Sequence, residues 1–81
     1  MILMDKAYML ISCDVGEEQS LYSQLKDIPE IKSCLITYGS YDLVVEFVAD
    51  GPEQINKIIT SKIRKLKKIR STITLRVTDS S

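Results

Sequence analysis

The sequence contains no histidine, no tryptophan and only two cysteines, and these shortages narrow the chemistry open to it. Histidine is the base of the common catalytic triads and a frequent zinc ligand, so its absence argues against both kinds of site. The cysteines, Cys13 and Cys34, do not form a CxxC pair, which argues against a zinc or redox motif. We therefore expect neither a metal nor any other cofactor.

Long hydrophobic runs are also missing. The longest uncharged stretch, Ser33–Tyr41, is far shorter than the ~20 apolar residues that span a bilayer. No basic segment precedes the apolar residues at the N-terminus, so a secretion signal is not predicted. We expect a cytoplasmic protein with no membrane contact.

The length of 81 residues allows one small domain, 1–81, and no second one. A domain of this size buries only about 60% of the surface that its unfolded chain exposes. The length therefore excludes a deep cleft between domains, and association with another chain would add to the buried surface.

The net charge is zero, but the two signs are separated along the sequence. Ten acidic residues and only three basic residues lie between Met1 and Glu53, and the other eight basic residues follow Glu53. The two parts carry about −7 and about +7. This separation argues against nonspecific nucleic-acid binding and predicts that the acidic part of one copy meets the basic part of another.

Six segments have the patterns of strands or helices. Short apolar or alternating runs predict strands at 7–13, 31–38, 42–49 and 69–78. Apolar residues spaced three and four apart predict one helix that begins at Gly16 and ends before Pro29, and another that begins near Pro52 and runs to Leu66. The order β-α-β-β-α-β predicts a ferredoxin-like α+β sandwich, with a four-stranded antiparallel sheet and two helices on one face.

A faint repeat supports this order, because Ile28–Leu35 resembles Leu66–Ile73 and each copy falls in one βαβ unit. About half of the sheet's second face is apolar, since both sides of the 42–49 strand carry apolar residues. An exposed apolar face of this kind marks an interface, so we expect a two-fold dimer through it. Scattered surface apolar residues are the simpler alternative.

The turn Thr37–Asp42 carries the densest cluster of polar and aromatic side chains. Gly39 can adopt a positive φ and let a ligand approach the backbone, and the Asp42 carboxylate can pair with an ammonium group. A tight turn with a capping aspartate explains the same residues. Ser71 and its neighbours in the last strand offer hydroxyl groups, although ordinary strand residues are the simpler interpretation.

A basic run covers the second helix and the loop after it. Such a run can bind phosphates, but a solvated helix face has the same composition, and no aromatic side chain is interleaved to stack on bases. The run consists of Lys57, Lys62, Arg64, Lys65, Lys67, Lys68 and Arg70.

Glu46 is an isolated charge on an apolar strand face. It is either a general base or, more simply, an exposed rim residue.

The turn Tyr38–Leu43, the string Lys62–Leu75 and the order of the elements together resemble the effector domain of the Lrp/AsnC transcription regulators, also called the RAM domain. The resemblance covers about 6–78. It implies a non-enzymatic domain that pairs through its sheets into dimers, which join in rings of four or five as octamers or decamers. It also implies that a free amino acid binds between neighbouring dimers.

The resemblance assigns the ligand site to two groups of residues. The turn of one dimer contacts the charged main-chain groups of the amino acid, and hydroxyl groups of the last strand come from the adjoining dimer. The implied ligand-binding residues are Tyr38, Gly39, Ser40, Tyr41, Asp42, Leu43, Ser71, Thr72 and Thr74.

Two departures from the family matter. Only six residues precede the first predicted strand, where full-length members carry a helix-turn-helix domain, so we expect no direct DNA binding. Co-assembly with full-length regulators is then a possible role. Lys67 and Lys68 also stand where many members have Pro-Gly, which makes this loop more basic.

The predicted function is an amino-acid-binding regulatory domain that acts through its assembly in transcriptional or metabolic regulation. An ACT-like sensor shares the strand order, but it pairs through sheet edges, which the apolar second face disfavours. A small ferredoxin-like enzyme is the other alternative. An acylphosphatase needs an arginine-bearing loop where this chain has the acidic segment Cys13–Glu18, and a dimeric α/β-barrel enzyme commonly relies on histidine.

Overall fold

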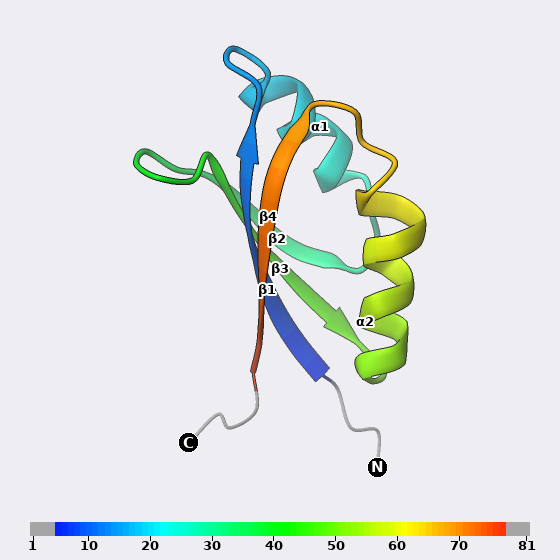
Figure 1. Ribbon diagram of the computed structural model, residues 1–81. Helices are drawn as coiled ribbons and strands as arrows, with labels where there is room; N and C mark the ends of the chain where they lie inside the picture. Colours follow the sequence, from blue (N-terminus) through cyan, green and yellow to red (C-terminus); the bar gives the residue numbers. More distant parts are fainter. Residues whose placement is uncertain (1–4, 78–81) are drawn as a thin grey trace.

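The computed structural model describes residues 5–77 and contains one antiparallel sheet with the helices on one side (Figure 1). The strand order is β2-β3-β1-β4, which confirms the predicted ferredoxin-like α+β sandwich. No helix in this part of the chain is long and apolar enough to cross a membrane. The elements are β1 (Asp5–Cys13), α1 (Glu18–Lys26), β2 (Ile31–Ile36), β3 (Leu43–Ala49), α2 (Pro52–Ile58), η1 (Ile59–Ile63) and β4 (Ile69–Arg76).

Several boundaries differ from the prediction by one or two residues. β2 ends at Ile36 and β3 begins at Leu43, so the turn between them is longer than the sequence suggested. Gly16 has φ +82° and lies in the turn before α1, whose N-cap is Glu17. β4 ends at Arg76, and the predicted end of that strand at 78 lies outside the described residues.

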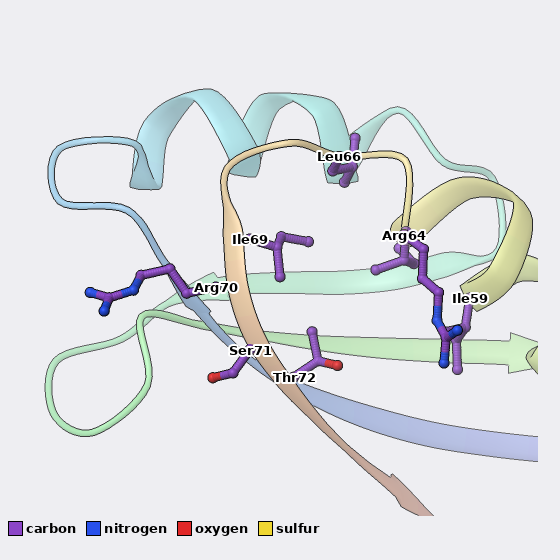
Figure 2. A pocket seen from close by; sticks show the side chains of 8 residues that line it. Ile59, Arg64, Leu66, Ile69, Arg70, Ser71 and Thr72 are labelled. Atoms are coloured by element: carbon purple, nitrogen blue, oxygen red, sulfur yellow. The ribbon is translucent and has the colours of Figure 1, made fainter.

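The second helix is shorter than predicted and changes its geometry. α2 ends at Ile58, and the chain continues as one π-helical turn, η1, in which the N–H of Arg64 donates to the carbonyl of Ile59 at 3.0 Å. A π turn holds one extra residue and is frequent at functional sites. Leu66 therefore falls outside the helix and lines a hollow between η1 and β4 (Figure 2).

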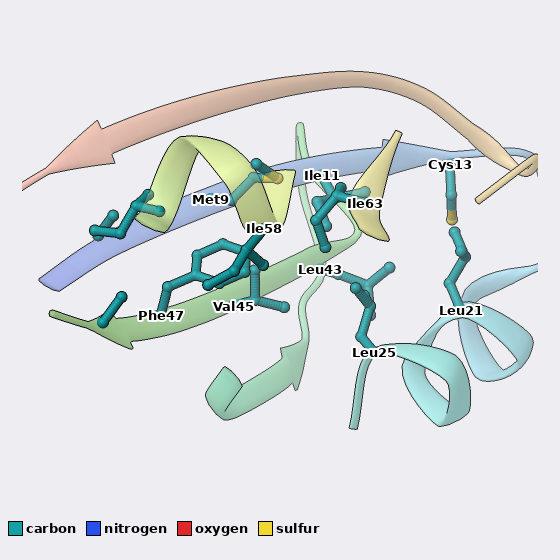
Figure 3. Close-up of a cluster of buried hydrophobic side chains, with 13 residues drawn as sticks. Met9, Ile11, Cys13, Leu21, Leu25, Leu43, Val45, Phe47, Ile58 and Ile63 are labelled. Carbon is teal, nitrogen blue, oxygen red and sulfur yellow. The ribbon is translucent and has the colours of Figure 1, made fainter. Parts of the chain in front are cut away.

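The core lies between the sheet and the helices (Figure 3). The alternation predicted for β3 is confirmed, because its odd-numbered residues are buried and its even-numbered ones face the other side. α1 contributes two leucines, and α2 and η1 contribute three isoleucines. The buried side chains are Ala7, Met9, Ile11, Cys13, Leu21, Leu25, Leu43, Val45, Phe47, Ala49, Ile55, Ile58 and Ile63.

A β-bulge near the start of β4 changes the face that Ile69 occupies. The pairing with β1 passes from Ser12 opposite Ser71 to Cys13 opposite Ile69, so Arg70 has no partner. Simple alternation places Ile69 and Ser71 on the same face. The bulge instead turns Ile69 towards the helices, where it packs against the core.

The face of the sheet away from the helices carries an apolar row across all four strands. In the cross-strand register, Leu35, Val44, Leu10 and Ile73 lie side by side from β2 to β4. Leu35 remains 59% exposed and Ile73 43% exposed, and Leu75 beside this row is 51% exposed. The half-apolar open face that the sequence predicted is therefore present, and nothing in residues 5–77 covers it (Figure 1).

Candidate functional site

The turn between β2 and β3 is held at the end of β1. Figure 1 shows that it projects from the sheet on the side away from the helices. The N–H of Thr37 donates to the carbonyl of Asp42 at 2.8 Å, and the N–H of Asp42 donates to the carbonyl of Ile11 at 2.8 Å. Gly39 has φ +146°, a conformation that favours glycine, as the sequence predicted. The turn is thus anchored to the central strands.

The carboxylate of Asp42 takes part in this anchoring. Its Oδ2 accepts a hydrogen bond from the backbone N–H of Cys13, the last residue of β1, at 2.9 Å. The carboxylate therefore holds the turn to the end of β1, and does not accept from an N–H of its own turn as the capping aspartate of a tight turn would. A carboxylate offers about four acceptor positions, so this bond leaves capacity for an ammonium group.

An open hollow of about 410 Å³ lies between the turn and the start of α1. Tyr38, Gly39 and Asp42 line it together with Glu18 and Gln19 of α1. No basic side chain belongs to the lining, so the two carboxylates attract a cationic group such as an ammonium. The sequence interpretation missed the two α1 residues, because the pattern along the predicted helix does not show which of its residues lie beside the turn.

The other predicted residues of the turn have different exposures. The side chains of Tyr38 and Ser40 are exposed, and that of Tyr41 is partly exposed. Leu43 differs from them, because its side chain is wholly buried in the core. Leu43 therefore anchors the turn and offers a ligand no side-chain surface within one chain.

The three hydroxyl residues of β4 do not share a face. Ser71 lies on the open face opposite Ser12, whereas Thr72 and Thr74 lie on the helix side. All three are exposed, since no helix covers this strand. Ser71 and Thr72 line the second hollow, of about 330 Å³, and not the one beside the turn.

The two predicted groups flank the end of β1 but do not meet within one chain. The turn reaches β1 through Asp42 and Cys13, and β4 reaches it through Ser71 and Ser12. Because β3 and β4 lie on opposite sides of β1, two strand spacings of ~5 Å separate the groups. A small ligand therefore does not contact both groups closely within one chain.

The charge separation along the sequence is partly neutralised inside the fold. Of the four ion pairs in the described residues, three join the acidic part to the basic part of the same chain. These pairs use part of the charge within one chain, and contact between the acidic part of one copy and the basic part of another stays a prediction. The three pairs are Lys62–Glu30 at 3.1 Å, Lys68–Glu17 at 3.4 Å and Arg76–Asp5 at 3.0 Å.

Glu46 is paired rather than exposed. Its side chain is only 15% exposed, lies 3.2 Å from Nζ of Lys6, and accepts a hydrogen bond from the Ser33 hydroxyl at 3.2 Å. The hydrogen bond from Lys6 holds the pKa of Glu46 below its usual value. The expected rim exposure is therefore wrong, and a lowered pKa makes Glu46 a weak general base near neutral pH.

The two cysteines are placed as apolar fillers. Burial, followed by the nearby Asp42 carboxylate, raises the pKa of Cys13 to about 11. Burial also raises the pKa of the partly covered Cys34. Both thiols therefore stay protonated at neutral pH, which makes them poor nucleophiles. Residues 5–77 contain no cluster of three side chains able to hold a metal ion.

Comparison with known proteins places this geometry in a family. The model of the Lrp/AsnC ligand binding domain matches residues 6–81. The crystal structure of FFRP-DM1 is 33% identical, superposes with a TM-score of 0.86, and the match covers 90% of this chain and 97% of that chain.

Longer proteins share the same fold. An uncharacterized HTH-type transcriptional regulator of Pyrococcus furiosus is 26% identical over 72 residues, which are 85% of this chain and 48% of the regulator. The chain thus spans about half the length of this curated relative. A transcriptional regulator of Neisseria meningitidis, solved in complex with L-methionine, is 12% identical with a TM-score of 0.82, covering 93% of this chain and 50% of that one. The match over nearly the whole chain, together with this fold, makes the protein a member of the Lrp/AsnC ligand-binding domain family.

Proposed function

We propose that the protein binds a free amino acid in transcriptional or metabolic regulation and acts by changing its assembly state, without catalysing a reaction. The observation that carries this proposal is the hollow beside the turn of Gly39, where Asp42 and Glu18 face no basic side chain. The α-ammonium group of an amino acid fits these carboxylates. The complex of the Neisseria meningitidis relative with L-methionine supports the ligand class.

The open face of the sheet supports the assembly part of the proposal. The apolar row from Leu35 to Ile73 would be covered by the same row of a second copy in a two-fold dimer. Such dimers would join into octamers or decamers, in which β4 hydroxyls of one dimer reach the turn of the next. An amino acid bound there would stabilise the assembly that completes its site.

The ligand test is a thermal-shift and calorimetry screen of all twenty amino acids. We expect at least one to bind and to raise the Tm. Asp42→Asn keeps an oxygen that can accept the Cys13 N–H but removes the charge, so binding should weaken at least tenfold while the free domain stays folded. Asp14→Asn, outside the lining of the hollow, is the control. If none of the twenty amino acids binds, the proposal is wrong.

The assembly test is light scattering coupled to size-exclusion chromatography. Ile73→Asp places a charge in the centre of the apolar row and should convert dimers and larger assemblies into monomers. Val15→Asp is the matched control, because Val15 is 93% exposed and lies in the turn after β1. A wild-type protein that elutes as a monomer at micromolar concentration would refute this part of the proposal.

Co-assembly with longer family members follows from the same surface. We propose that the protein also pairs, through the open face, with the ligand-binding domains of full-length regulators. Co-expression with a tagged full-length regulator should retain the wild-type chain on an affinity column and lose Ile73→Asp. Equal retention of both chains would argue against this surface.

A further inference from the structure

A second hollow, of about 330 Å³, lies on the helix side of the molecule between η1 and the start of β4 (Figure 2). This volume falls at the lower end of the range for small-molecule pockets, about 300–1,000 Å³. Its apolar lining residues are buried or partly buried and form its base, whereas its polar lining residues are exposed and form its rim. The hollow therefore has the composition of a site for a small amphipathic molecule.

The base of the hollow keeps apolar surface in contact with water. Ile63 is buried, whereas Ile59, Leu66 and Ile69 are only partly buried and pack against the core. Their contacts with the core hold these side chains in place. A short branched hydrocarbon group that covered them would remove this surface from water, which favours binding.

Arg64 provides a positive charge at the rim. The π turn sets its position, because its N–H is bonded to the carbonyl of Ile59. Figure 2 shows its side chain extending towards Ile59, across the hollow from Thr72. None of the ion pairs in residues 5–77 involves Arg64, so its guanidinium is free to bind an anion.

The surroundings of the hollow strengthen this preference for an anion. Lys65 and Lys67 lie in the same connecting loop, where positive charges add to the local potential. Arg70 also belongs to the lining, but it is the unpaired residue of the bulge, and Figure 2 shows its side chain pointing away from Arg64 and Thr72. Lys57 of α2 is an exposed cation outside the lining and therefore offers the control for the charge of Arg64.

We propose that this hollow binds a small organic acid with one carboxylate and a short branched apolar chain. The carboxylate accepts hydrogen bonds from the guanidinium of Arg64 and the hydroxyl of Thr72, and the chain covers Ile59, Leu66 and Ile69. An inorganic anion would match the charge but leave the apolar base uncovered.

Two sources share this ligand chemistry: an apolar amino acid, and the 2-oxo acid that remains when its amino group is removed. The second has no ammonium group and so needs no carboxylate from the protein. The proposal overlaps with the amino-acid site only in the β4 hydroxyls and does not depend on the turn.

The test is a titration of the ¹⁵N-labelled protein followed by NMR. The probes are 4-methylpentanoate, 4-methyl-2-oxopentanoate, L-leucine, acetate and 3-methylbutylamine. Both branched acids should shift the amide signals of Ile59, Leu66, Ile69 and Thr72, and acetate and the amine should bind at least tenfold more weakly. Arg64→Gln should weaken binding of the acids at least tenfold, and the control Lys57→Gln at most twofold. Thermal unfolding verifies that both variants are folded.

The outcomes separate this proposal from the proposed function. Equal binding of the acids to Arg64→Gln and wild type, or shifts only at other amides, would overturn it. If L-leucine binds and neither acid does, the hollow is not an acid site, while the amino-acid function stands. If the acids bind and no amino acid binds in the wider screen, the proposed acid site is supported and the proposed amino-acid function is wrong. Unchanged acid binding to Asp42→Asn supports a site separate from the turn.

Discussion

The two edge strands, β2 and β4, occupy matching positions in the two βαβ halves, but the helices cover only one of them. α1 packs against β2, whereas α2 packs against β3 and β1. One cross-strand row runs from β2 to β4 and contains Cys34, Val45, Met9 and Thr74 in that order. Cys34 and Thr74 therefore lie at its two ends. Cys34 packs against the core, and Thr74 is exposed.

This difference shows how a polar strand face leaves room for a site. Beyond Ile69 at its start, β4 presents Thr72, Thr74 and Arg76 on the helix side, and these give a helix little apolar surface to cover. α2 therefore packs over the central strands, and the hollow beside η1 stays open. At the corresponding places of β2, Ile31 and Cys34 are packed against the core, so β2 needs its helix.

The largest effect on stability should come from removing the packing of α1 against β2. Leu25 of α1 is wholly buried, so Leu25→Ala should lower the free energy of unfolding by about 2–5 kcal/mol. Hydrogen exchange of the β2 amides should also rise more than that of the β4 amides. Urea unfolding and hydrogen exchange measure the two effects. Thr72→Ala is the control and should change stability by less than ~0.5 kcal/mol. If Leu25→Ala raised hydrogen exchange equally in β2 and β4, both edge strands would be covered alike by the helices.

A smaller effect should distinguish the two ends of one row. Cys34→Ser places a hydroxyl group in partly buried apolar surroundings and should lower the free energy of unfolding by about 1–2 kcal/mol. Thr74→Ser removes only an exposed methyl group and should stay within about 0.5 kcal/mol of wild type. Both are measured by urea unfolding. A greater loss for Thr74→Ser would contradict its exposure.

The smallest effect concerns the ion pair that joins η1 to the start of β2. Hydrogen bonding to Lys62 holds the pKa of Glu30 below its usual value near 4.5. The pair therefore stabilises the fold above that value, and the contribution is lost as the pH falls through the lowered pKa. Both side chains are partly exposed, so solvent and salt screen the pair.

Lys62→Gln should therefore lower the free energy of unfolding by at most about 1 kcal/mol at pH 7, and the difference from wild type should shrink as the pH falls through the lowered pKa of Glu30. Lys65→Gln, which removes a charge from the same basic run, is the control. A difference that persists undiminished at pH 3 would show that Lys62 acts through some other contact.

Much of the candidate turn was predictable from its residues. The special conformation at Gly39 and the presence at Asp42 of a carboxylate that can accept hydrogen bonds follow from the properties of those residue types. The partner of that carboxylate was not predictable, because Cys13 lies on a different strand. Glu18 was missed for the same reason, since only the packing of α1 places it beside the turn.

The sequence by itself determined the order of the elements, the alternation of side chains along β3 and the apolar character of the open face. These features repeat every two residues in a strand or every three to four in a helix, so they are readable locally. The tertiary structure decided the bulge at Arg70, the π turn that positions Arg64, and the ion pairs that neutralise part of the charge separation. Each of these depends on how distant segments pair and pack, and no local pattern specifies that.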